Sequence, residues 1–172
     1  PERVAEVAAL IIDAHRKYGI ATCIKHFPGH GLAGGDTHQD LVDITSTWQE
    51  ERELSPYKQL IAQGKADIIM TAHLIHKRYS SKLPVSLVPD LNYGILRERC
   101  GYDGLIMADD LHMGAISRYN TIEEVTKLSW LAGNDIILFS NNPAAAGHDN
   151  TNFIIDHNVA EKVTATTLNL IQ

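Results

Sequence analysis

The feature that most constrains the fold of this 172-residue chain is a repeated alternation of short apolar segments with amphipathic helical segments. Four apolar segments recur at intervals of about forty residues, a spacing typical of parallel β/α units. We predict strands over about residues 21–27, 66–73, 104–109 and 134–140. Helical periodicity precedes the first strand, over residues 3–17, and recurs after each strand. The expected fold is therefore α/β, with parallel strands joined by right-handed crossovers.

The charge, the hydropathy and the cysteine content of the chain argue against several kinds of partner and site. The chain carries a net charge of -6, which argues against unassisted binding to nucleic acid or to an anionic membrane surface. No apolar run approaches the ~20 residues needed to cross a bilayer. The two cysteines, Cys23 and Cys100, lie far apart and are expected to be free thiols rather than a disulfide or zinc ligands. We expect no nucleic-acid partner, no membrane partner, no metal and no cofactor.

Polar residues stand at the carboxyl end of every predicted strand. A single polar strand end is commonly only the cap of the next helix. Four of them predict a shared site, because ligands bind at this edge of the sheet in both open and closed parallel architectures. The residues are Lys25 and His26, Thr71 and His73, Asp109 and Asp110, and Ser140 and Asn141.

The segment 25–38, KHFPGHGLAGGDTH, is followed some seventy residues later by GLIMADDLHMGAI. This combination closely resembles glycoside hydrolase family 3, in the β-N-acetylglucosaminidase branch with its KHFPGHG…DSH loop. IIMTAHL, PVSLVP and LAGNDIILF resemble further family segments in the same order. The resemblance implies a TIM-type (β/α)8 barrel, which typically needs ~250 residues. Residues 1–172 match about its C-terminal half, and we expect one partial domain of four β/α units preceded by a helix.

The resemblance also implies catalytic roles. Asp109 aligns with the nucleophile, the carboxylate that forms a covalent glycosyl-enzyme in retaining glycosidases. His38 aligns with the acid/base and is paired with Asp36, while Thr37 stands where the family usually has Ser. An imidazole with its ordinary pKa near ~6.5 can give and take a proton close to neutral pH. Adjacent strand residues point to opposite faces, so we expect Asp110 to bond the backbone instead of addressing the site.

The same resemblance assigns substrate contacts. Lys25 and His26 are expected to hydrogen-bond sugar hydroxyls, and His30 to brace the loop. His73 either lines the pocket floor or is a buried structural histidine, and Met113 either packs beside the N-acetyl group or belongs to the core. The implied activity is retaining exo-hydrolysis of terminal β-N-acetylglucosamine from glycans or muropeptides. The expected partner is a carbohydrate that contains N-acetylglucosamine.

Three alternatives stay open at this point. A metal-dependent barrel hydrolase could draw its ligands from His26, His30, His38, His73 and Asp109. A non-catalytic half-barrel that binds sugar would explain why the family's first-half sugar ligands have no match here. A phosphorylase within the family is also open, because a neutral histidine repels phosphate less than a glutamate would. The missing first half of the barrel, or another copy of the chain, would then complete the fold.

Overall fold

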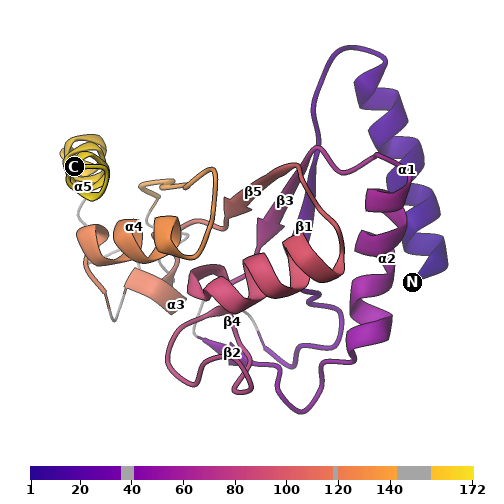
Figure 1. Cartoon of the computed structure of the whole chain (residues 1–172), viewed down its shortest axis with the longest axis horizontal. Helices are drawn as coiled ribbons and strands as arrows, with labels where there is room; N and C mark the ends of the chain where they lie inside the picture. The colour runs from indigo at the N-terminus through magenta and orange to yellow at the C-terminus, as the bar shows by residue number, and fades with distance from the viewer. Residues whose placement is uncertain (36–40, 118–119, 143–155) are drawn as a thin grey trace.

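The computed structural model describes residues 1–35, 41–117, 120–142 and 156–172. Figure 1 shows a small central sheet, with the N-terminal helices at its right and the C-terminal helices at its left in this view. No helix in these ranges is both long enough and apolar enough to cross a membrane. The elements follow in the order α1 (Glu2–Arg16), β1 (Cys23–Phe27), β2 (Val42–Asp43), α2 (Glu50–Ala62), β3 (Ile68–Thr71), β4 (Leu74–Ile75), the 3-10 helix η1 (Val85–Leu87), the π-helix η2 (Asp90–Arg99), β5 (Leu105–Ala108), α3 (Gly114–Ser117), α4 (Ile122–Leu131) and α5 (Val159–Leu170).

The main sheet has the order β1-β3-β5, and both strand pairs are parallel. This arrangement confirms three of the four predicted strands and the parallel α/β class. The stretch predicted as a fourth strand, 134–140, forms no regular strand. It runs beside β5 through one bridge, Met107 to Ile136, and a few backbone hydrogen bonds. Within the described residues no further strand pairs with its outer side.

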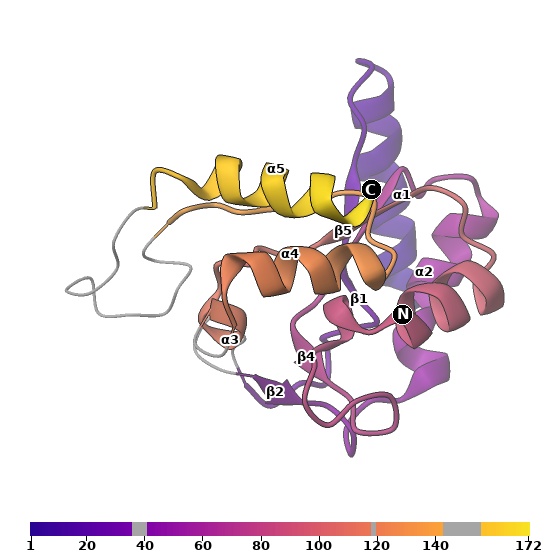
Figure 2. The same ribbon diagram turned by 60° about the vertical axis from the view of Figure 1, so that its left-hand side comes forward.

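Apolar side chains from the sheet and the surrounding helices form the core. Phe27, Ile69 and Ile106, one from each strand, are fully buried in one cluster with Leu54 of α2 and Leu96 of η2. Burial of each such side chain is worth roughly 1.5–3 kcal/mol. A second cluster joins the end of β5 to α4, and α5 packs against α4 (Figure 2). The packed sheet thus fixes the positions of the strand ends from which the loops begin.

The free side of β1 is open. A cleft of about 1020 Å³ lies between α1, β1 and α2. Two apolar side chains of α1, Val4 and Ile11, line this cleft and are exposed. Among the described residues, the main sheet continues from β1 only toward β3. The first strand is therefore an edge strand, as expected of part of a barrel.

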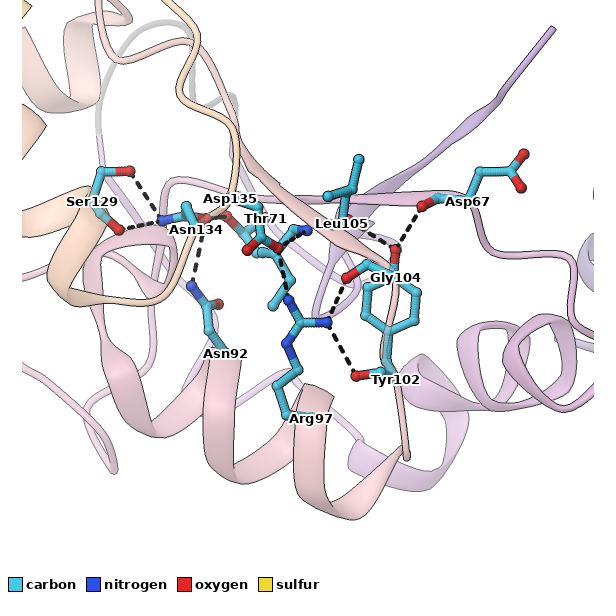
Figure 3. A network of polar contacts seen from close by, with 11 residues as sticks. Asp67, Thr71, Asn92, Arg97, Tyr102, Gly104, Leu105, Ser129, Asn134 and Asp135 are labelled. Carbon is cyan, nitrogen blue, oxygen red and sulfur yellow. Dashed lines mark hydrogen bonds and ion pairs between the residues drawn. The ribbon is translucent and has the colours of Figure 1, made fainter. Parts of the chain in front are cut away.

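Polar contacts join the β/α units at the amino ends of the strands (Figure 3). The Arg97 guanidinium donates to the carbonyl oxygens of Tyr102 and Gly104, just before β5. It also pairs with Asp135 at 2.7 Å, and the same carboxylate oxygen accepts from the backbone N–H of Ile106. These contacts tie η2, β5 and the 134–140 stretch together at the end of the sheet opposite Asp109.

Candidate active site

Asp109 and His26 meet at the carboxyl edge of the sheet. Asp109 directly follows β5, and His26 lies in β1, with β3 between the two strands. His26 Nε2 lies 3.7 Å from Asp109 Oδ2, and the two side chains are 32% and 14% exposed. The backbone N–H of Asp109 donates to the carbonyl of Thr71 on β3, which fixes its place. Lys25, beside His26, is exposed. The fold therefore brings together two of the predicted site residues from separate β/α units.

The neighbouring aspartate has a different environment. Asp110 is buried, and its Oδ1 accepts from the backbone N–H groups of His112, at 3.0 Å, and Ser140, at 2.9 Å. Its Oδ2 accepts from the Ser140 hydroxyl. The carboxylate thus anchors the end of the 134–140 stretch to the end of β5. This confirms the expectation that Asp110 bonds the backbone.

His73 is fully buried, and both of its ring nitrogens have partners in the protein. Nε2 lies 2.9 Å from the Asp110 carbonyl oxygen, and Nδ1 lies 2.7 Å from Ser86 Oγ. A carbonyl can only accept, so Nε2 carries the proton and Nδ1 of the neutral ring accepts from the serine. Burial lowers the pKa of His73, which favours this neutral form. The structural alternative for His73 is therefore favoured over a place on the pocket floor.

Stability should depend on pH because His73, His76 and His112 are buried and their pKa values are lowered chiefly by desolvation. In the unfolded chain histidine takes up a proton near pH ~6.5. The folded state resists that proton, so its stability is complete above this pH and is lost as pH falls below it. Urea unfolding at pH 7.5 and pH 5.5 should give a lower free energy at pH 5.5. Replacing the exposed His15 by Gln should leave the difference unchanged, and equal stability at both pH values would contradict the prediction.

Met113 is 3% exposed and lies in the turn before α3. Its backbone carbonyl accepts from the N–H groups of Ile116 and Ser117. With the side chain packed inside the protein, the structure favours the core alternative over contact with an N-acetyl group. His73 bonds the carbonyl of Asp110 just after β5 and so helps to fix the end of that strand.

The loop after β1 is tightly built at its start. Gly29 has a φ of +118°, and a Cβ at this position would lie 2.3 Å from Glu53 Oε2, so only glycine fits. The ring of His30 is edge-on to that of His26, with centroids 6.0 Å apart. Asp36 and His38, the predicted acid/base pair, lie outside the described residues.

The metal alternative loses one of its proposed ligands. His73 has both nitrogens engaged within the protein and cannot bind a metal without breaking those contacts. In the described parts of the chain, no group of three or more His, Cys, Asp or Glu side chains could hold a metal ion. His38 lies outside those parts.

Sequence reasoning missed two residues at the site. Trp48, which no sequence motif singled out, donates its indole N–H to the carbonyl of Pro28 in the loop after β1. Ser86 accounts for one ring nitrogen of His73. Each partner is distant in sequence, so no local pattern could have predicted either contact.

Comparison with known proteins decides the family. The model of the glycosyl hydrolase family 3 N terminal domain matches residues 1–168. The chain belongs to glycosyl hydrolase family 3. This confirms the resemblance found in the loop signature. Proteins named beta-hexosaminidase are similar to it: that of Tolumonas auensis is 33% identical over 148 residues and that of Mannheimia succiniciproducens 35% identical over 144. These alignments cover 85% and 83% of this chain but 44% and 41% of the relatives.

Solved structures of family 3 support the same fold. A β-N-acetylglucosaminidase from Paenibacillus superposes with a TM-score of 0.74 at 31% identity, over 98% of this chain and 34% of that one. NagZ from Neisseria gonorrhoeae, in complex with N-trifluoroacetyl-D-glucosamine, gives a TM-score of 0.71 at 29% identity, over 96% of this chain and 49% of that one. The chain thus spans less than half the length of the relatives and structures described here. Its parallel β/α units correspond to part of the family 3 barrel.

Proposed function

We propose that this chain supplies the catalytic carboxylate of a retaining β-N-acetylhexosaminidase that releases terminal β-linked N-acetylglucosamine. The observation that carries the proposal is the approach of His26 to Asp109 at the carboxyl edge of the sheet. This edge is where parallel barrels bind their substrates. Membership of family 3 and similarity to proteins named beta-hexosaminidase support the choice of substrate.

In this proposal Asp109 is the nucleophile. One of its oxygens bonds the anomeric carbon while the bond from that carbon to the aglycone oxygen breaks, and water later cleaves the glycosyl ester with retention. The position of the carboxylate supports this role. Oδ1 accepts from the backbone N–H of Asp110 at 2.8 Å, and Oδ2 faces His26. The side chain is thus held at a strand tip with one oxygen turned toward the site.

The proton transfers are assigned to His38 and Asp36 on the basis of the loop signature. His38 gives a proton to the departing aglycone oxygen and later takes one from the attacking water. Asp36 fixes the tautomer of the imidazole and stabilises its charged form. Lys25 and His26 hydrogen-bond the sugar hydroxyls, a task suited to groups that end a strand beside the nucleophile. Further sugar contacts would come from the part of the barrel that this chain does not span.

The test is an assay of the full-length protein with 4-nitrophenyl glycosides and with chitobiose. Hydrolysis of the β-N-acetylglucosaminide, with much slower cleavage of the β-glucoside, is the expected result. NMR of the first product should show the β-anomer, as retention requires. An α-anomer as first product would overturn the mechanism. A sugar 1-phosphate formed only with phosphate would indicate a phosphorylase, and loss of activity on chelation would favour the metal alternative.

A further inference from the structure

The indole of Trp48 holds the loop that follows β1. Its Nε1 donates to the carbonyl oxygen of Pro28 at 3.0 Å, across twenty residues of sequence. Pro28 comes directly after β1 and is two residues from His26. We propose that Trp48 is a positioning residue of the active site, which fixes the start of this loop and, through it, the place of His26 beside Asp109. The inference rests on the function proposed above.

The coupling from Pro28 to His26 runs through one tight turn. The backbone N–H of Gly29 donates to the carbonyl of His26 at 2.9 Å, so Pro28 lies inside a turn that contains the His26 backbone. Glu53, from the first turn of α2, packs so closely against Gly29 that no side chain would fit there. Because the hydrogen bond from Gly29 closes the turn on the His26 carbonyl, we expect a shift of Pro28 to move His26 as well.

Trp48 is itself well supported. Its backbone N–H donates to the carbonyl of Ile44 at 2.8 Å. Its ring stands edge-on against that of His76 with centroids 5.1 Å apart, and His76 in turn contacts the ring of Tyr79 at 5.0 Å. His76 directly follows β4, which pairs with β2. The indole is thus fixed to the β3 and β4 unit, and its hydrogen bond ties the loop after β1 to that neighbouring unit.

The hydrogen bond adds something that ring packing does not. Pro28 is buried, so its carbonyl oxygen needs a donor within the protein. Removing the indole N–H leaves that buried acceptor unsatisfied, which costs more than a lost surface contact. The carbonyl can regain a partner by turning toward water, and this would move the turn that contains His26. Phenylalanine at position 48 retains an aromatic ring and removes only the donor and part of the ring area.

The second tryptophan offers a matched control. Trp130 is also half-buried, and its Nε1 donates to the Thr167 hydroxyl at 2.9 Å, between α4 and α5. Trp48→Phe and Trp130→Phe therefore remove one indole donor each, in two different parts of the fold. We expect Trp48→Phe to lower kcat of the full-length enzyme at least about tenfold with a smaller change in KM, because misplacement near reacting groups affects the chemical step. Trp130→Phe should leave both constants unchanged.

Hydrogen exchange followed by mass spectrometry supplies a readout that does not need activity. Amides in residues 29–35 should exchange faster in Trp48→Phe, while segments of the core exchange as in the wild type. Trp130→Phe should leave exchange in residues 29–35 unchanged. The inference is overturned if both variants behave alike, or if Trp48→Phe raises exchange throughout the chain, which would show a general loss of stability. A wild type without hexosaminidase activity would refute the proposed function, and the exchange comparison would still decide whether Trp48 holds the loop.

Discussion

Replacing Asp109 by Ala in the full-length protein should lower kcat by at least about a thousandfold, since loss of a nucleophile removes the step on which turnover depends. Thermal stability should fall less than in Asp110→Ala, because Asp109 accepts one backbone N–H group whereas Asp110 accepts two. With a slowly hydrolysed substrate, the wild-type peptide that contains Asp109 should carry one N-acetylhexosaminyl group, detected by mass spectrometry. Substantial remaining activity in the variant would refute the assignment of the nucleophile.

Asp110→Ala is the matched control for that experiment. The change leaves the backbone N–H groups of His112 and Ser140 without their carboxylate acceptor, in a buried place. We expect a loss of about 3 kcal/mol in the free energy of unfolding, as for buried groups left unsatisfied. Asp109→Ala should thus chiefly lower kcat, and Asp110→Ala should chiefly lower the free energy of unfolding. The reverse result would assign the nucleophile to Asp110 and the structural role to Asp109.

His38→Ala should give a loss that depends on the leaving group. For an aglycone with a poor leaving group, such as a sugar, we expect kcat/KM to fall by about 10²–10⁴-fold, the usual contribution of a general acid. For an activated phenol the loss should be small, because that group departs without a proton. The slope of log kcat/KM against leaving-group pKa measures the difference.

The neighbouring loop histidine tests whether this pattern is specific. His30→Ala removes an imidazole that contacts the ring of His26, so any loss should be the same for good and poor leaving groups. Asp36→Asn should reproduce the His38 pattern in weaker form, because Asp36 acts through His38. An equal loss for all leaving groups in His38→Ala would count against His38 as the acid.

Periodicity was enough to predict most of the fold because the deciding interactions are local. The helix predicted over residues 3–17 is α1, and three apolar segments are the parallel strands β1, β3 and β5. Ligands bind at the carboxyl edge of parallel strands, and this rule predicts that His26 and Asp109 share one site. Their observed separation of 3.7 Å agrees with that expectation.

The remaining features depend on partners distant in sequence. The stretch 134–140 has the composition of a strand, but it pairs with β5 through only one bridge, Met107 to Ile136, and the apolar pattern does not determine how far such pairing extends. The role of His73 was open because a histidine at a strand end is either a ligand or a buried donor, and Ser86 decides between them. The contact of Trp48 with Pro28 likewise depends on how the loop returns to the sheet.

The contacts of Arg97 with Asp135, Tyr102 and Gly104 have a practical meaning for protein engineering. They hold consecutive β/α units together at the end of the sheet opposite the proposed sugar site. The residues that stabilise this part of the fold are therefore different from those proposed to act on the substrate. A library that randomises exposed positions in the loops after β1 and β5 would leave these contacts untouched. Variants selected from such a library for new glycoside specificities would keep the contacts that hold these units together.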